Sequence, residues 1–209
     1  MSSATSYVTL RKLRKNVVTT GAAAAALGVS ESSASRSLRT LAAQGLVRRV
    51  SQGIWTLDTD GTGDPRAIIR DLRRPSYVSF QSALASHGVI DQIPRETTLA
   101  SLGRPRRVRT ALGTFGLHRL PAALFGGFED KNGVPMASVE KALVDYFYVA
   151  SASGHPHRRL PELELPANFS VKKMRKWIAR IPSPRLQTLV ETGVDRALLH
   201  AEYEDPRSR

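Results

Sequence analysis

Residues 19–57 read TTGAAAAALGVSESSASRSLRTLAAQGLVRRVSQGIWTL, and this stretch decides the fold of the N-terminal part of the chain. It opens with an alanine-rich run over 22–27, and alanine is the strongest helix former. Thr19 or Thr20 can cap this helix, because a threonine side chain accepts a hydrogen bond from the first free amides. Gly28 then supplies the left-handed residue that ends a helix in a tight turn.

A second helix follows at once. Ser30 is a natural N-cap, and Gly45 ends the segment. Between them the apolar residues fall at helical intervals, which predicts one narrow buried stripe made of Ala34, Leu38, Leu41 and Ala42. Upstream, residues 6–15 have the pattern of a short basic helix.

Two short strands are predicted after these helices. Residues 46–50 and 54–57 are rich in β-branched and aromatic side chains, and the turn formers of 51–53 separate them. Helix, glycine turn, helix and hairpin in this order are typical of a winged helix-turn-helix. We therefore expect that domain over residues 1–58.

The second of these helices presents hydroxyl and arginine side chains once its apolar stripe is buried. Small hydroxyls let a helix approach the floor of the major groove, and arginine can hold guanine or phosphate. Side chains of the hairpin can reach the backbone or minor groove, and a helix N-terminus can hold a phosphate. The candidate DNA-binding residues are therefore Thr19, Thr20, Ser32, Ser33, Ser35, Arg36, Arg39, Thr40, Arg48, Arg49 and Gln52.

The distribution of charge favours this interpretation over an ordinary three-helix unit with a solvated surface. The chain carries 31 Lys and Arg against 18 Asp and Glu, a formal net charge of +13. Residues 1–58 hold eight basic and two acidic side chains, and residues 167–209 hold nine and five. A solvated surface mixes both signs, whereas an acid-poor segment is typical of a nucleic-acid-binding face. We expect double-stranded DNA as a partner.

Composition excludes several classes of protein. The chain has no cysteine, so disulfides, cysteine-ligated zinc, iron–sulfur clusters and thiol catalysis are ruled out. No apolar run approaches the roughly 20 residues of a membrane helix, and residues 1–20 lack the apolar block of a signal peptide. His155 and His157 lack acidic neighbours and make a weak metal-ligand set. We expect a cytoplasmic protein with no membrane partner, no active site, no metal and no cofactor.

A second domain is predicted after a linker. Residues 58–65 concentrate turn formers, residues 66–74 have the pattern of a short amphipathic helix, and Pro75 ends it. This places the linker and short helix at 59–75 and the second domain at 76–209. In the second domain we expect a helix that begins at Ser79 and ends at Gly88, and strands over 97–102, 107–112 and 115–120.

Three further helices are expected in the second domain. The first opens at Met136-Ala-Ser-Val and keeps one apolar face, with Glu140, Lys141 and Asp145 outside it. A second helix, capped by Ser170, and a third over 185–201 form an antiparallel pair. The fold class is therefore α+β: an N-terminal winged helix-turn-helix followed by a mixed α/β domain that ends in a helical pair.

Two basic segments of the second domain allow two interpretations each. The helix after Ser170 has a basic side that is either solvated or a secondary nucleic-acid contact, formed by Lys172, Lys173, Arg175 and Lys176. Residues 104–109 place four arginines within six positions. Such charges commonly protect a strand edge from aggregation, and the alternative is a second nucleic-acid contact.

At two places the sequence resembles the AbiEi family of antitoxins. Residues 77–90 (YVSFQSALASHGVI) and the EKALVD run at 140–145 resemble its second domain, with Val139 departing from an expected proline. The winged helix that runs from GLVRR at 45–49 to GIWTL at 53–57 is similar to its N-terminal domain. The resemblance covers about residues 7–150.

The resemblance implies an antitoxin of a type IV toxin–antitoxin system of the abortive-infection, phage-defence kind. The N-terminal domain would bind inverted repeats at its own promoter and repress the operon. The C-terminal domain would oppose a nucleotidyltransferase-like toxin, without an assumed stable complex. Two alternatives remain: a stand-alone winged-helix regulator whose second domain senses a ligand or dimerises, and an enzyme with catalytic residues in the second domain.

Overall fold

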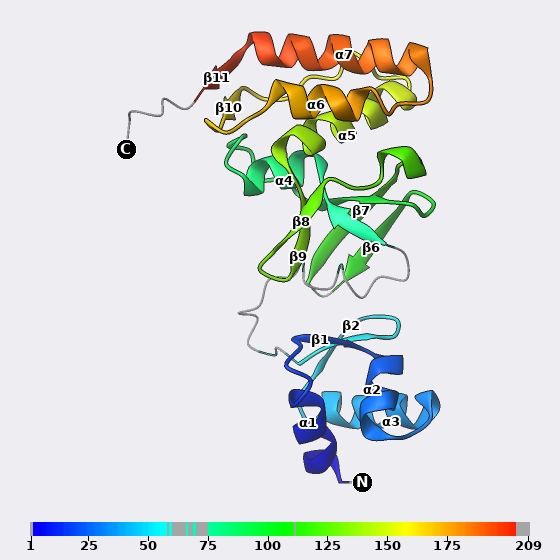
Figure 1. Cartoon of the computed structure of the whole chain (residues 1–209). Helices are drawn as coiled ribbons and strands as arrows, with labels where there is room; N and C mark the ends of the chain where they lie inside the picture. Colours follow the sequence, from blue (N-terminus) through cyan, green and yellow to red (C-terminus); the bar gives the residue numbers. More distant parts are fainter. Residues whose placement is uncertain are drawn as a thin grey trace. The chain divides into compact units, whose positions relative to one another are not determined.

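The computed structural model describes residues 2–57, 59, 66, 69, 75–110 and 112–203, and the chain forms two compact units (Figure 1). Residues 2–57 belong to the first unit, and residues 75–108 and 114–203 belong to the second. Both helices and strands are present, which confirms the α+β class. The predicted linker and the helix over 66–74 lie outside the described residues except at isolated positions. No helix in the described part of the chain is long and apolar enough to span a bilayer.

The first unit is a three-helix core backed by a small sheet. Its elements are α1 (Ser3–Arg11), β1 (Val17–Thr19), α2 (Thr20–Leu27), α3 (Glu31–Ala43), β2 (Arg48–Ser51) and β3 (Ile54–Thr56). The strands form an antiparallel sheet in the order β1-β3-β2. Leu10, Leu27 and Leu38 from the three helices pack with Trp55 of the sheet in one buried cluster. This arrangement is that of a winged helix-turn-helix.

The turns of the first unit form where glycine was expected to allow them. Gly28 ends α2 with a φ of +65°, and Gly53 turns the hairpin with a φ of +77°. Residues with a side chain rarely adopt such angles. Strand β1 was not expected, and the adjacent Val17 and Val18 were its only signal in the sequence. This strand pairs with β3, and the amide of Thr20 donates to the carbonyl of Gly53 at 2.9 Å.

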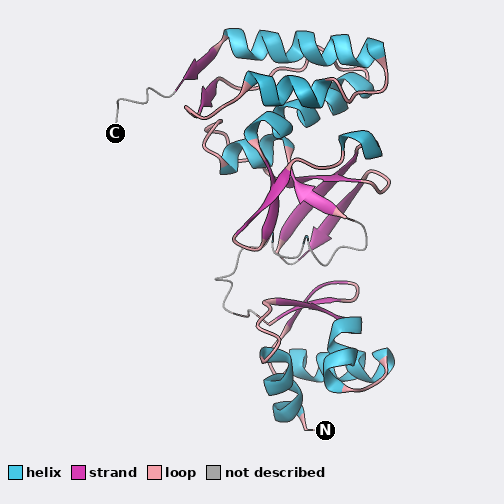
Figure 2. Ribbon diagram, in the orientation of Figure 1, coloured by secondary structure: helices cyan, strands magenta, loops and turns pink. Residues whose placement is uncertain are grey.

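The second unit is a mixed sheet covered by helices (Figure 2). Its six strands follow the order β6-β7-β5-β4-β9-β8. They are β4 (Ser76–Val78), β5 (Thr97–Ser101), β6 (Arg106–Thr110), β7 (Gly113–Arg119), β8 (Phe128–Lys131) and β9 (Val134–Ala137). A 3-10 turn at Ala122–Leu124 follows β7.

Four helices complete the second unit, with α5 at their centre. They are α4 (Phe80–Ser86), α5 (Val139–Ala152), α6 (Val171–Ile178) and α7 (Pro184–Leu199). Helix α5 contacts each of the other three, and the α6–α7 pair lies on the side away from the sheet (Figure 1). A parallel pair of short strands, β10 (Leu163–Leu165) and β11 (Ala201–Tyr203), joins the ends of this layer.

Several elements differ from the sequence prediction. Strands β4, β8, β9, β10 and β11 were not expected, and Met136 lies in β9 rather than at the start of a helix. Helix α5 begins at Val139, because Ser138 caps it and accepts a hydrogen bond from the amide of Lys141. The missed β8–β9 hairpin did carry a signal: its turn holds Asn132 and Gly133 at positive φ, the residue pair that two-residue hairpin turns favour.

Candidate nucleic-acid interface

Helix α3 is built to present one face to solvent. Ser30 caps it, with its hydroxyl oxygen accepting from the amide of Ser33 at 3.3 Å. Ala34, Leu38 and Leu41 are fully buried, as the apolar stripe predicted. The predicted contact residues divide into two groups: Ser33 and Ser35 are half-buried, and the exposed ones are Ser32, Arg36, Arg39 and Thr40.

The two arginines of α3 are available to a ligand. Arg36 and Arg39 are exposed, and neither takes part in any ion pair among the residues that the structure describes. The hydroxyl of Thr40 donates to the carbonyl of Arg36 at 3.2 Å, so its hydrogen is used within the helix. Ser32 shares a hydrogen bond with the capping Ser30 at 3.0 Å. Arginine is therefore the side chain of this face with the most unused donors.

The start of α2 is held together by the two threonines predicted there. The hydroxyl oxygen of Thr19 accepts from the amide of Ala22 at 3.0 Å, and that of Thr20 accepts from Trp55 Nε1 at 3.1 Å. Each hydroxyl keeps its own hydrogen, which can still donate to a phosphate oxygen. Glu31 lies close by, since a Cβ placed on Gly21 would come within 3.2 Å of its Oε1. Thr19 thus caps α2 as predicted, whereas the contact of Thr20 with Trp55 was not expected from the sequence.

The hairpin carries the remaining candidates. Arg48, Arg49 and Gln52 are all exposed. The guanidinium of Arg49 lies 5.9 Å from the centre of the Trp55 ring, and this same tryptophan donates to Thr20. Trp55 therefore connects the hairpin to the start of α2, two parts of the predicted binding face.

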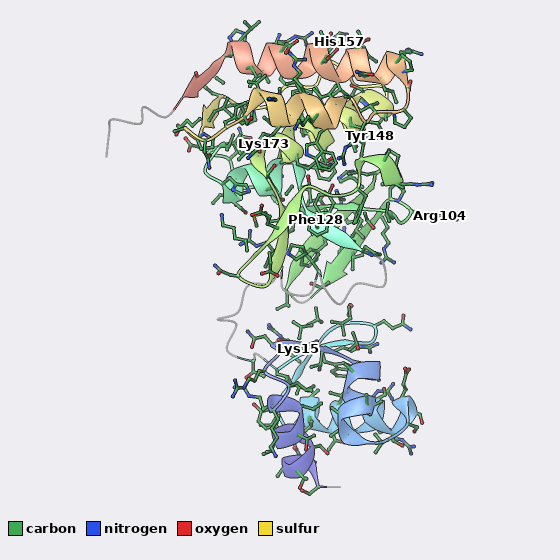
Figure 3. All side chains as sticks on the ribbon, viewed as in Figure 1. Lys15, Arg104, Phe128, Tyr148, His157 and Lys173 are labelled. Atoms are coloured by element: carbon green, nitrogen blue, oxygen red, sulfur yellow. The ribbon has the colours of Figure 1, made fainter. Side chains whose placement is uncertain are left out.

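Charge over residues 2–57 is almost entirely positive. Glu31 is the one carboxylate side chain among residues 2–57, against eight lysines and arginines. Four of these basic side chains follow one another around the end of α1, where Lys15 is labelled in Figure 3, and all four are exposed: Arg11, Lys12, Arg14 and Lys15. Such a surface attracts a polyanion at long range.

The basic side of α6 in the second unit is partly neutralised. Arg175 is held by two carboxylates of α7, Glu191 at 3.3 Å and Asp195, and this contact packs α6 on α7. Lys172, Lys173 and Lys176 are exposed. In the arginine-rich stretch, Arg107 pairs with Glu96 at 2.7 Å. Of the four predicted secondary contact residues, Arg175 is therefore paired, and the three lysines make no ion pair among the described residues.

A buried charged network contradicts the expected exposure of one face of α5. Glu140, Lys141 and Asp145 were expected outside, but they are 6%, 0% and 0% exposed. Lys141 Nζ pairs with Asp145 Oδ1 one helical turn away. The other oxygen of Asp145 accepts from the hydroxyls of Ser79 at 2.7 Å and Tyr77 at 3.0 Å. Trp177 of α6 covers Lys141, and Tyr77 and Ser79 cover Asp145, so charge on this face is enclosed.

Electrostatics explains why each polar group of this network needs the others. Burial raises the pKa of Asp145 and lowers the pKa of Lys141, and the charge of each partner opposes the shift of the other. Burial, and then the charge of Asp145, raise the pKa of Tyr77, so its hydroxyl stays protonated and donates. Ser79 precedes α4, where it was expected to cap the helix, but its side chain makes no capping hydrogen bond there and its hydroxyl donates to Asp145.

Aromatic rings enclose the lysine of this network. Lys141 Nζ lies 4.9 Å from the centre of the Trp177 ring and 5.5 Å from that of Tyr77. Gly127, at a φ of +70°, lets Trp177 approach so closely that an added Cβ would stand 2.6 Å from its ring. The one sequence signal for this arrangement was a Lys–Asp pair spaced i,i+4 in an otherwise apolar helix.

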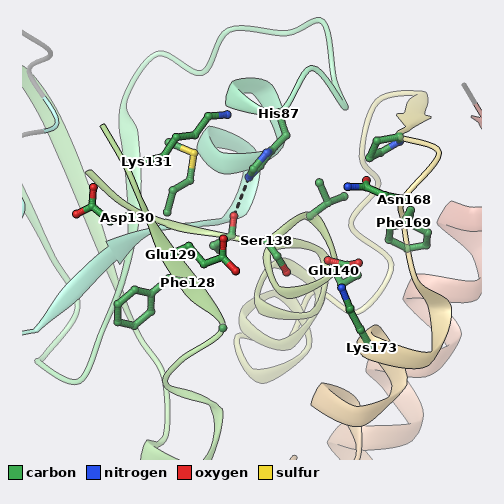
Figure 4. A pocket seen from close by; sticks show the side chains of 15 residues that line it. His87, Phe128, Glu129, Asp130, Lys131, Ser138, Glu140, Asn168, Phe169 and Lys173 are labelled. Carbon is green, nitrogen blue, oxygen red and sulfur yellow. Dashed lines mark hydrogen bonds between the residues drawn. The ribbon is translucent and has the colours of Figure 1, made fainter. Parts of the chain in front are cut away.

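A cavity of about 690 Å³ lies beside the start of α5 (Figure 4). His87, at the end of α4, closes one side, and its Nε2 lies 2.8 Å from the carbonyl oxygen of Ala137. Its lining mixes carboxylates (Glu129, Asp130 and Glu140) with lysines (Lys131 and Lys173). Glu140 Oε1 accepts from the amide of Ser170 at 3.1 Å and so fixes the start of α6. Among the described residues, which include His155 and His157, no three metal-ligating side chains lie close enough together to hold a metal ion.

Comparison with known protein families finds a match within the first unit. Residues 6–57 match the family described as "Transcriptional regulator, AbiEi antitoxin". This match spans α1 to the hairpin and confirms the resemblance read from the sequence over this domain. No curated protein matches the chain.

Proposed function

We propose that this chain, whose N-terminal domain is of the AbiEi antitoxin and transcriptional-regulator type, represses its own operon and opposes a nucleotidyltransferase-like toxin. The first unit binds inverted repeats in promoter DNA, and the second unit provides the antitoxin activity, both in the cytoplasm. The observation that carries this proposal is α3 itself: a capped helix whose two exposed arginines make no ion pair with any residue that the structure describes. Residues 2–57, to which α3 belongs, hold a single carboxylate, Glu31.

The geometry supports a defined mode of DNA binding. Helix α3 enters the major groove with Arg36 and Arg39 directed at base edges or phosphates. The hairpin places Arg48, Arg49 and Gln52 on the adjacent backbone or minor groove. An inverted repeat presents two copies of the half-site, so two chains bind one operator.

Alanine substitution of either arginine of α3 tests this mode. Arg36→Ala or Arg39→Ala is expected to weaken binding to the promoter duplex by about 1–3 kcal/mol where the side chain contacts a base. Arg39→Lys keeps the charge but loses the planar fork, so it separates base reading from a phosphate contact. Fluorescence polarisation with a labelled duplex measures the effect.

Arg185→Ala is the matched control. Arg185 is an exposed arginine of α7, so its substitution removes the same charge from another part of the chain. It is expected to change duplex affinity little. If the α3 variants bind the promoter as tightly as Arg185→Ala does, the proposed reading helix is wrong.

Truncation separates the two proposed activities. The buried cluster of the first unit is formed entirely within residues 10–57, so a chain of residues 1–75 is expected to fold and keep DNA binding. The same fragment should fail to restore growth when co-expressed with the toxin encoded by the neighbouring gene. Growth rescue by residues 1–75 would contradict the division of labour between the units.

The cavity of about 690 Å³ in the second unit favours one alternative function. A stand-alone regulator that senses a ligand would need such a space, because small-molecule pockets usually hold roughly 300–1,000 Å³. The same co-expression distinguishes this alternative from the antitoxin: under it, the full chain represses its promoter but leaves toxin-induced growth arrest unchanged.

A further inference from the structure

A second cavity in the second unit lies between α7, α5 and the segment that precedes β10. Its volume is about 370 Å³, which is within the usual range for small-molecule pockets. All its lining residues belong to the second unit, and none belongs to the basic side of α6 or to the buried Lys141–Asp145 network.

The lining of this cavity is strongly basic. Arg158 and Arg159 come from the segment before β10, and Arg196 and His200 come from the end of α7. None of the three arginines takes part in an ion pair among the described residues. Glu162 is the single carboxylate of the lining, and it too makes no ion pair there. Three arginines that line one concavity and make no ion pair among the described residues are suited to an anion.

The segment that carries two of these arginines is held in place by Tyr146 of α5. The tyrosine hydroxyl donates to the carbonyl of Arg159 at 2.9 Å, and the guanidinium of Arg158 lies 5.4 Å from the centre of the tyrosine ring. A site ordered before binding loses less conformational entropy when a ligand arrives. The arginines are therefore positioned on a fixed backbone.

The rest of the lining is apolar. Phe147 of α5 and Ala197 of α7 line the cavity together with Gly193, and Leu160 and Pro161 contribute further apolar surface. Gly193 allows this close packing, because a Cβ at that position would stand 2.6 Å from the Phe147 ring. The ligand thus needs an apolar part as well as an anionic group.

We propose that this cavity binds a small phosphate-bearing molecule with a flat apolar part, of the nucleoside monophosphate class. Phosphate offers several oxygens to planar guanidinium donors, which hold it in two-point contacts. The apolar lining receives the base, and Glu162 accepts hydrogen bonds from sugar hydroxyls or an exocyclic amine. The larger cavity near His87 does not suit such a ligand, because three carboxylates line it.

The test is calorimetric titration of the full-length protein with the four common nucleoside 5′-monophosphates, and with adenosine and inorganic phosphate. At least one monophosphate is expected to bind with a Kd of about 1 mM or below, and more tightly than either part alone. Arg159→Ala and Arg196→Ala are each expected to weaken it about tenfold or more, since each removes charge-assisted hydrogen bonds. Arg185→Ala, on the same helix as Arg196 but outside the lining, should change it less than about twofold.

Three outcomes would overturn the proposal. The first is the absence of heat from every monophosphate up to about 10 mM, well above the expected Kd. The second is equal affinity for adenosine and its monophosphate. The third is that Arg185→Ala weakens binding as much as Arg159→Ala and Arg196→Ala do. Arg159 is exposed, so its variant remains informative if the half-buried Arg196 proves necessary for folding. Promoter binding is measured on the same samples, and a chain that binds promoter DNA but no monophosphate would refute this inference alone.

Discussion

Asp145→Ala is expected to lower the free energy of unfolding of the second unit by about 3–5 kcal/mol, the usual cost of removing one partner from a buried ion pair. The carboxylate of Asp145 is fully buried and contacts three groups: the ammonium of Lys141 and the hydroxyls of Ser79 and Tyr77. Its loss leaves a buried charge and two buried hydroxyls without their acceptor. Each of these groups then loses its hydration without compensation.

Urea unfolding followed by the fluorescence of Trp177 measures this loss, because that ring lies 4.9 Å from Lys141 Nζ. The chain has two tryptophans, so a Trp55→Phe background makes the signal specific to the second unit. Asp195→Ala is the control, because it breaks an ion pair on the surface. In that pair the Arg175 side chain is 39% exposed and the Asp195 side chain 51% exposed. Exposed pairs contribute about 0–1 kcal/mol. A loss for Asp145→Ala no larger than that for Asp195→Ala would contradict the role of the network.

The affinity for promoter DNA is expected to fall about a thousandfold between 50 and 200 mM salt, if roughly six phosphates are neutralised. The first unit carries eight basic side chains and one carboxylate over residues 2–57, so cation release from the DNA should dominate binding. This loss exceeds the effect expected from any single substitution in α3.

Fluorescence polarisation at a series of salt concentrations measures the slope of log affinity against log salt. Arg48→Ala is expected to reduce the slope by about one if Arg48 contacts a phosphate. A slope close to zero would show that the first unit does not neutralise DNA phosphates, which contradicts the role proposed for its basic side chains. The proposed function would then lose its main support.

The first unit was predictable because its signals are local. Helix caps at Thr19 and Ser30, and glycines at positions 28 and 53 that accept positive φ, act within a few residues of their place in the chain. The apolar stripe of α3 then leaves its arginines exposed without any need for distant contacts. The contact residues themselves remain predictions, although their exposure agrees with the proposed interface except at the half-buried Thr19, Thr20, Ser33 and Ser35.

The second unit was less predictable because its short strands are identified by their neighbours. Strand β4 is three residues long and lies in the sheet between β5 and β9, which come from distant parts of the chain. The Asn132-Gly133 turn was the local signal that could have revealed the β8–β9 hairpin. The arginine-lined cavity had no signal in sequence order, because its arginines come from two segments more than thirty residues apart.

Helical periodicity therefore predicted the winged helix-turn-helix and the exposure of its arginines, because an amphipathic helix buries its apolar side whatever the tertiary arrangement around it. Whether a charged residue is buried depends instead on which groups arrive from elsewhere. Periodicity placed Lys141 and Asp145 in water, but Trp177 of α6 covers the lysine. The hydroxyls of Tyr77 and Ser79 satisfy the carboxylate of Asp145 across more than sixty residues of sequence. Only the folded chain brings those partners together, because burying a charge becomes tolerable once its hydrogen bonds are complete.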